Sequence, residues 1–188
     1  MIHFPENLRR LKRGPQVMLP KDIGMVLGFT GVGRKSLVVD AGAGSGWLAI
    51  ALGNVCKKVV AYERREDFAK LAGENVKRAG LQRYVKIAQK DVFEGIEETE
   101  VDLVTLDMAD SEKVIPHAHK ALKEGGMVVG YLPHAEQVQR FVKALNDEKF
   151  RDVFCIECIV REMLAREAGF RPDTTGLWHT GYLVFAKK

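Results

Sequence analysis

The residues best suited to chemistry are acids and glycines that follow short apolar runs. The first such run, Leu37–Val39, leads into an acid, a glycine at every second position and a helix-like segment. Glycine has no Cβ, so the main chain there can approach a bound molecule closely. The pattern predicts a strand, a tight turn and a helix that cradle a ligand. The candidate binding residues of this segment are Asp40, Gly42, Gly44, Ser45, Gly46 and Trp47.

Two further acids stand where later apolar runs end. Glu63, with Arg64 beside it, comes roughly 20 residues beyond the glycine turn, where an acid can accept both hydroxyls of a ribose. Asp91 follows the run 85–88 and can accept from the amine of an adenine, while Val92 packs on its ring. Together with the glycine turn they predict a nucleoside-binding site.

Asp107 and Tyr131 are the candidates for catalysis. Asp107 ends the run 101–106 and lies close enough in the order of strands to be a cofactor contact as well. A carboxylate there can hydrogen-bond an amine or favour positive charge that develops on an alkylated nitrogen. Tyr131 ends the run 127–132 and can stack on a base; the alternative is a packed core tyrosine.

Alternating strands and helices are expected to position these residues. The expected strands are 36–40, 58–63, 85–88, 101–106, 127–132, 152–163 and 179–186. The first five alternate with helical patterns, which predicts an α/β fold with a mostly parallel sheet and helices on both faces. The last two, joined by a loop, predict an antiparallel edge. Ligands of open α/β sheets bind at the carboxyl ends of the strands, where the candidate residues fall.

Composition indicates one ordinary globular domain. The chain has 188 residues, of which 46% are hydrophobic and 29% charged. No apolar run is long enough to cross a bilayer, and we see no apolar core of a signal peptide, so we expect a cytoplasmic protein without a membrane partner. Cys155 and Cys158 form a lone CxxC, which we interpret as buried core thiols. We expect no metal site.

The N-terminal segment is basic. The formal net charge is +4, and Arg9, Arg10, Lys12 and Arg13 stand close together. We therefore divide the chain into a short basic arm, 1–18, and a domain, 19–188. A basic arm suits a phosphate backbone; the alternative is a solvated tail.

Several motifs resemble those of known families. An acid followed by GxGxG, at Asp40–Gly46, resembles motif I of the S-adenosylmethionine (SAM)-dependent methyltransferases. Beyond it, the chain resembles the catalytic domain of the tRNA (adenine-58-N1) methyltransferases, closest to archaeal members. The segments that carry this resemblance are Arg13–Gln16, Pro20–Asp22, Tyr62–Ala72, Asp91–Ile96, Tyr131–Pro133 with Gln137–Val138, Arg161–Glu162, Arg171–Pro172 and His179–Leu183.

The resemblance implies a Rossmann-like class I methyltransferase fold and SAM as cofactor. It also implies methylation of adenine N1 in tRNA, with Asp107 at the target base. Finally, it implies a homotetramer in which the late strands help to build the contacts.

The sequence departs from the family pattern at three points. The family carries a small β domain before Arg13, and here only about a dozen residues precede it. Leu19 stands where relatives usually have a tyrosine or histidine, and the Pro-Trp that usually follows the catalytic aspartate is missing after Asp107. Two alternatives to an RNA methyltransferase therefore stay open: a small-molecule enzyme like the precorrin methyltransferases, or a non-catalytic SAM-binding partner subunit.

Overall fold

The computed structural model describes residues 4–14, 16–167 and 169–188. Residues 1–3 and Pro15, which belong to the predicted arm 1–18, lie outside the described residues. The helices are α1 (Glu6–Arg9), α2 (Pro20–Thr30), α3 (Trp47–Gly53), α4 (Glu66–Arg78), α5 (Ile115–Ala121) and α6 (Ala135–Asp147), with short 3-10 helices η1 (Val92–Glu94) and η2 (Ser111–Val114). The strands are β1 (Leu37–Ala41), β2 (Lys58–Tyr62), β3 (Val85–Ala88), β4 (Val101–Leu106), β5 (Leu122–Leu132), β6 (Arg151–Glu157), β7 (Met163–Arg166), β8 (Gly169–Pro172) and β9 (Tyr182–Lys187).

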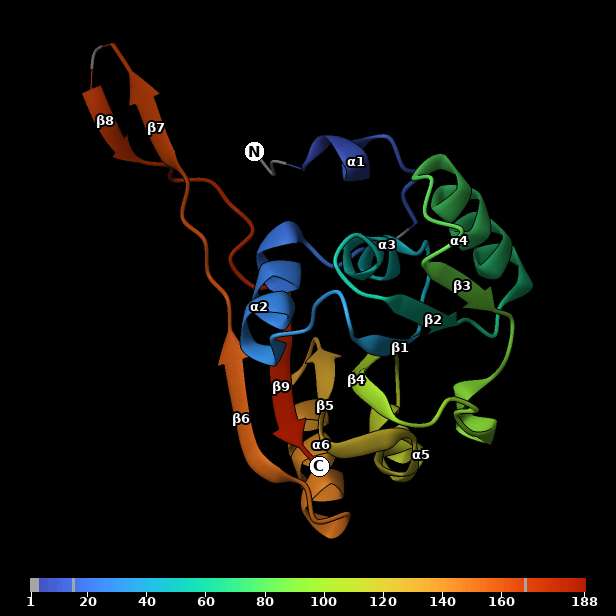
Figure 1. Ribbon diagram of the computed structural model, residues 1–188. Helices are drawn as coiled ribbons and strands as arrows, with labels where there is room; N and C mark the ends of the chain where they lie inside the picture. The colour runs from blue at the N-terminus through green and yellow to red at the C-terminus, as the bar shows by residue number, and fades with distance from the viewer. Residues whose placement is uncertain (1–3, 15, 168) are drawn as a thin grey trace.

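Seven strands form one sheet in the order β3-β2-β1-β4-β5-β9-β6 (Figure 1). The pairs from β3 to β5 are parallel, and β9 runs antiparallel to both β5 and β6. The predicted α/β fold with a mostly parallel sheet and an antiparallel edge is confirmed. Strand β1 lies between β2 and β4, so chain order reverses beside it, the place where open α/β sheets bind ligands.

Alternation along the strands builds two cores, one on each face of the sheet. Val38 and Val59 pack with α2, α3 and α4 on one face, while the next residues, Val39 and Val60, pack with α5 and α6 on the other. Figure 1 shows these two helical layers above and below the sheet. Because strands β1 to β4 are covered on both faces, only their ends are free to contact a ligand.

Strands β6 and β9 contact α2 through a group of three aromatic rings. Phe154 of β6 stacks on Phe185 of β9 with ring centroids 4.8 Å apart, and Phe29 of α2 lies 5.6 Å and 5.5 Å from these rings. This contact fixes α2 beside the end of the sheet that carries β9.

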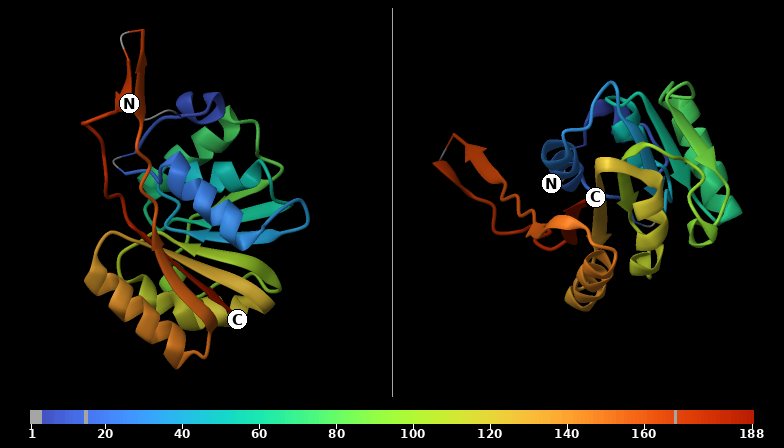
Figure 2. Two further views of the ribbon diagram at one scale, coloured as in Figure 1. Left: turned by 90° about the vertical axis from the view of Figure 1, so that its left-hand side faces the viewer. Right: turned by 60° about the horizontal axis from the view of Figure 1, so that its bottom comes forward.

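The expected strand 152–163 is wrong in its second half. Strand β6 ends at Glu157, and β7 and β8 form a separate hairpin that projects from the body (Figure 2). The apolar residues Ile159 and Val160, which suggested a continued strand, are exposed in the link to this hairpin. The prediction that Cys155 and Cys158 are buried core thiols is also wrong, because Cys155 is exposed and Cys158 half-buried.

The described part of the basic arm packs against the body. Leu8 and Leu11 are buried in the core that α3 shares with the sheet. Lys12 forms an ion pair with Glu74 of α4 at 3.0 Å, and Arg10 pairs with Glu6 at 2.9 Å. The segment therefore presents its basic side chains from a packed structure.

Candidate active site

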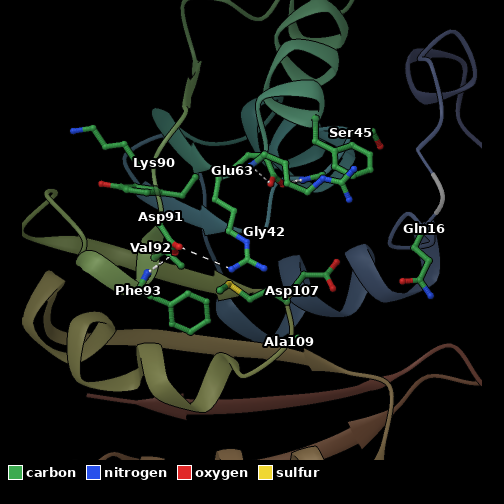
Figure 3. Close-up of a pocket in the computed structure, with 16 residues that line it drawn as sticks. Gln16, Gly42, Ser45, Glu63, Lys90, Asp91, Val92, Phe93, Asp107 and Ala109 are labelled. Atoms are coloured by element: carbon green, nitrogen blue, oxygen red, sulfur yellow. Dashed lines mark hydrogen bonds and ion pairs between the residues drawn. The ribbon is translucent and has the colours of Figure 1, made fainter.

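The turns after β1 to β4 surround a cavity of about 420 Å³ (Figure 3). All of these turns lie at the carboxyl edge of the sheet, because the strands are parallel. The cavity is lined by Gln16, Gly42, Gly44, Ser45, Tyr62, Glu63, Arg64, Arg65, Phe68, Lys90, Asp91, Val92, Phe93, Asp107, Met108 and Ala109.

Gly42 brings the glycine turn against the end of β4. Its φ is +86°, and a Cβ at this position would lie 2.2 Å from the main-chain oxygen of Asp107. No other residue fits without displacing that main chain. The glycine thus sets the spacing between the glycine turn and Asp107.

Glu63 holds the glycine turn from the end of β2. The residue is only 8% exposed, and its carboxylate accepts hydrogen bonds from the N–H groups of Gly44 and Arg65, both at 2.9 Å. A carboxylate has about four lone-pair sites, so it retains the capacity to accept from a ligand. Figure 3 shows it in the middle of the cavity.

Asp91 and Val92 form the part of the wall after β3. Asp91 accepts from the N–H of Phe93 at 3.0 Å and so caps η1, while its other oxygen lies 3.9 Å from the guanidinium of Arg64. Val92 is buried and lines the cavity with its apolar side chain. This wall offers one acceptor and one apolar surface side by side.

Asp40 is buried beneath the glycine turn. One carboxylate oxygen accepts from the hydroxyl of Thr105 at 2.7 Å, and the other has no partner. Burial raises the pKa of Asp40 to about 6, with a smaller contribution from the charge of Glu63, although the Thr105 hydrogen bond opposes the shift. The Asp40 carboxylate therefore supports the glycine turn through its hydrogen bond with Thr105 of β4.

Asp107 is half-buried where β4 ends. Burial raises its pKa to about 7, and the neighbouring charge of Asp40 adds to the effect. Both causes penalise the ionised form. A carboxyl group with a pKa near neutrality can respond to a bound amine or to a developing positive charge, which would favour its ionised form.

Three buried side-chain oxygens of the described residues have no hydrogen-bond partner: Asp40 Oδ2, Ser45 Oγ and Ser111 Oγ. Ser45 lines the cavity and belongs to the glycine turn. Buried polar atoms normally have a partner. The unused hydroxyl of Ser45 therefore fits a cavity that receives a polar ligand.

Eight of the predicted site residues line the cavity: Gly42, Gly44, Ser45, Glu63, Arg64, Asp91, Val92 and Asp107. Asp40, Gly46 and Trp47 are close in sequence but are not among the lining residues. Trp47 is buried on α3, where its ring centroid lies 5.0 Å from that of Phe4. Its Nε1 donates to the carbonyl of Lys12 at 3.4 Å.

Tyr131 is not among the lining residues either. Its hydroxyl donates to a carboxylate oxygen of Asp22 in α2, at 3.2 Å. It nevertheless follows Gly130, which pairs with Leu106 of β4, so Tyr131 and Asp107 end adjacent strands at the same edge.

Sequence reasoning missed half of the cavity wall. Arg65 and Phe68 come from the start of α4, with the guanidinium 4.2 Å from the ring centroid, and Met108 and Ala109 come from the turn after Asp107. Each lies within a few residues of a predicted acid. The whole turn that follows each strand, and not only its acid, could therefore have been predicted to line the cavity. Gln16 carried a signal only through the motif Arg13–Gln16.

The described residues contain no group of three or more His, Cys, Asp or Glu side chains placed to hold a metal ion. Within the same residues, no helix is long and apolar enough to cross a membrane.

The chain is similar in sequence to known tRNA methyltransferases. Residues 8–177 match the family described as "tRNA methyltransferase complex GCD14 subunit". The chain is 37% identical to the tRNA (adenine(57)-N(1)/adenine(58)-N(1))-methyltransferase TrmI of Methanocaldococcus jannaschii, over 96% of this chain and 74% of that protein.

Two solved structures have closely similar folds. The tRNA (m1A58) methyltransferase TrmI of Aquifex aeolicus gives a TM-score of 0.90 at 27% identity, over 97% of this chain and 74% of the other. A SAM-dependent O-methyltransferase of Thermotoga maritima gives a TM-score of 0.93 at 33% identity, over 98% and 71%. Each of these two structures thus matches nearly the whole of this chain.

Proposed function

The chain belongs to the tRNA methyltransferase family described as the GCD14 subunit, and we propose that it transfers a methyl group from SAM to N1 of an adenine in tRNA. The observation that carries this proposal is the meeting of Gly42, Glu63, Asp91 and Asp107 at one cavity. Two carboxylates that can accept hydrogen bonds from a ribose and an adenine, Glu63 and Asp91, line the same cavity as Asp107. The carboxyl group of Asp107 suits a basic group that receives the methyl. A tRNA acceptor also supports the expected cytoplasmic location.

The residues present fit SAM. We infer that Glu63 accepts from the ribose hydroxyls, that Asp91 and Val92 hold the adenine, and that the turn from Gly42 to Ser45 holds the methionine end. The unpartnered Ser45 hydroxyl and the missing Cβ at Gly42 support this fit. Bound there, SAM supplies a methyl group that its sulfonium has already activated, so the protein mainly aligns the acceptor and excludes water.

Asp107 is assigned to the acceptor. The target base must leave its stack to enter a pocket. In this proposal the Asp107 carboxylate accepts a hydrogen bond from the exocyclic amine of the adenine. It also offsets the positive charge that grows on the ring as N1 is alkylated, an effect that is strong where water is excluded.

Tyr131 and Leu19 are assigned to the walls of the acceptor site. Tyr131 lies on the strand next to Asp107 and offers a ring that packs against a base. Leu19, the residue before α2, is buried and offers an apolar wall where relatives have a ring. This substitution is expected to loosen the selection of the target base.

The basic residues of the N-terminal segment are assigned to RNA. Arg9 and Arg13 carry no ion pair among the described contacts, while Lys12 and Arg10 share their charge with Glu74 and Glu6. Neutralising the four residues together is expected to flatten the salt dependence of RNA binding.

We also propose a homotetramer that uses the late strands. The hairpin β7–β8 and its links expose large apolar side chains, namely Ile159, Val160, Met163, Phe170, Leu177 and Trp178. Strand β6 is an edge of the sheet, and such edges are usually covered. Light scattering is expected to give a particle of four times 21.0 kDa, and a monomer at micromolar concentration contradicts the proposal.

Labelled SAM tests the proposed activity directly. The purified protein is incubated with total tRNA or with a small-molecule extract, and the labelled product is digested to nucleosides. We expect label in N1-methyladenosine from tRNA. Label in the small-molecule extract alone contradicts the proposal and favours a small acceptor.

A further inference from the structure

Asp22 is a completely buried carboxylate outside the cavity. It lies in the first turn of α2, where Pro20 begins the helix, and its side chain has no exposed surface. Burying a carboxylate is unfavourable unless donors surround it. The donors that surround it therefore indicate what this residue holds in place.

Three side chains donate to Asp22, and they come from distant parts of the sequence. Lys21 Nζ donates to Oδ1 at 2.8 Å, while the hydroxyls of Thr180 and Tyr131 donate to Oδ2 at 2.9 Å and 3.2 Å. Lys21 also donates to the Thr180 hydroxyl at 2.7 Å and to the carbonyl of Cys158 at 2.5 Å. We call Lys21, Asp22, Tyr131 and Thr180 the Asp22 network.

The Asp22 network fixes the phenol of Tyr131. A phenol has a single proton to donate, and here that proton is directed at Asp22. The main chain lies against the ring as well, since a Cβ at Gly181 would come within 2.9 Å of two ring carbons. The hydroxyl and the ring are thus held by different parts of the protein, and the side chain has little freedom to turn.

The fixed side chain stands beside Asp107. The two residues follow the paired positions Leu106 and Gly130 on parallel strands. Burial raises the pKa of Tyr131 well above its usual range, and the charges of Asp22 and Asp107 add to the effect. Tyr131 therefore stays a neutral donor to Asp22 and cannot become a competing anion next to Asp107.

We propose that Asp22 is a positioning residue for methyl transfer, whose carboxylate fixes Tyr131 beside Asp107 and so fixes the wall against which the acceptor base packs. This inference rests on the proposed function. Asp22 itself contacts neither the acceptor nor SAM; it acts through Tyr131. Small misplacements near a reacting centre lower rates strongly, so the residue affects turnover more than binding.

A double-mutant cycle in the full chain tests the inference. Asp22→Asn keeps the shape of the side chain and removes its charge, and we expect kcat on tRNA to fall about 10-fold with SAM affinity within twofold of wild type. Tyr131→Phe removes the donor. If Asp22 acts through the Tyr131 hydroxyl, Asp22→Asn costs little more in the Tyr131→Phe background. An unchanged kcat for Asp22→Asn, or effects that multiply in the double variant, overturn the inference.

An NMR titration of the unaltered protein with ¹³C-labelled tyrosine gives a readout that needs neither a variant nor activity. We expect Tyr131 to keep its proton above the ordinary phenol pKa of about 10. Titration of Tyr131 at that ordinary value overturns the inference. A wild-type protein that methylates no tRNA contradicts the proposed function instead, and the titration still decides whether Tyr131 stays a neutral donor.

Discussion

The cavity and the Asp22 network lie at the ends of neighbouring strands, yet they use their polar groups differently. In and beneath the cavity, Ser45 Oγ and Asp40 Oδ2 are buried without a partner. In the network, one carboxylate receives three side-chain donors. The cavity is arranged to receive a polar ligand, whereas the Asp22 carboxylate already has its hydrogen-bond donors within the protein. The difference indicates that ligand binding completes the cavity, whereas the network supplies a fixed wall.

The largest effect is expected from Asp107, which lies between the two regions. Asp107→Ala removes a preorganised electrostatic contact, so turnover on tRNA should fall by about 10²–10³. SAM affinity, measured by calorimetry, should stay nearly unchanged. A variant that loses SAM binding and turnover together would place Asp107 on the cofactor side of the comparison.

Glu63 tests the cavity alone. Glu63→Ala removes a paired acceptor for two hydroxyls, so the free energy of SAM binding should weaken by about 1.5–3 kcal/mol. The matched control is Glu63→Gln, which keeps one acceptor oxygen and should lose less. Calorimetry that finds both variants binding like wild type contradicts the ribose assignment.

Asp40 tests whether an ionised carboxylate buried beneath the cavity lowers the stability of the folded protein. Its folded-state pKa of about 6 lies above the ordinary 3.8, so its protonated form is favoured by folding. That stabilisation is present below pH 3.8 and is lost as the pH rises through about 6. Asp40→Asn cannot titrate, so between pH 4 and 7 its stability should rise relative to wild type, by on the order of 2 kcal/mol. Urea unfolding at the two pH values measures this, and a constant difference between the proteins contradicts it.

The smallest effect is expected at His179, beside the Asp22 network. Its Nδ1 lies 2.6 Å from a Glu157 carboxylate oxygen and its Nε2 lies 2.9 Å from the Pro133 carbonyl oxygen. Both partners only accept, so a ring that satisfies both must carry two protons. The Pro133 carbonyl and then Glu157 raise the pKa of His179. The stabilisation is therefore present below the ordinary value of 6.5 and is lost as the pH rises through the raised pKa.

Glu157→Gln should lower the pKa of His179, measured by an NMR titration of both proteins. An unchanged His179 pKa in this variant would show that the carboxylate does not hold the protonated ring.

The sequence predicted the cavity better than the acceptor side, for a physical reason. Parallel strands bring the acids that follow them to one edge, so Glu63, Asp91 and Asp107 could be placed from strand order alone. Trp47 could not, because it lies on α3 and its side chain turns away toward Phe4. The Tyr131 hydroxyl depends on Asp22, which is 109 positions away along the chain, and no local pattern connects the two. The projecting hairpin was missed because Ile159 and Val160, the exposed apolar residues in the link to it, resemble those of a buried strand.

Whether the Asp107 carboxylate meets the acceptor is tested most directly by the pH dependence of single-turnover methyl transfer to tRNA. Because the pKa of Asp107 is raised to about 7, at pH 6 only about a tenth of the molecules carry the carboxylate. We expect the wild-type rate to rise about eightfold from pH 5.5 to 6.5 and to level off above pH 7.5, and Asp107→Asn to be slow and flat over the same range. A wild-type rate independent of pH, or Asp107→Asn as fast as wild type, would show that the Asp107 carboxylate does not meet the acceptor.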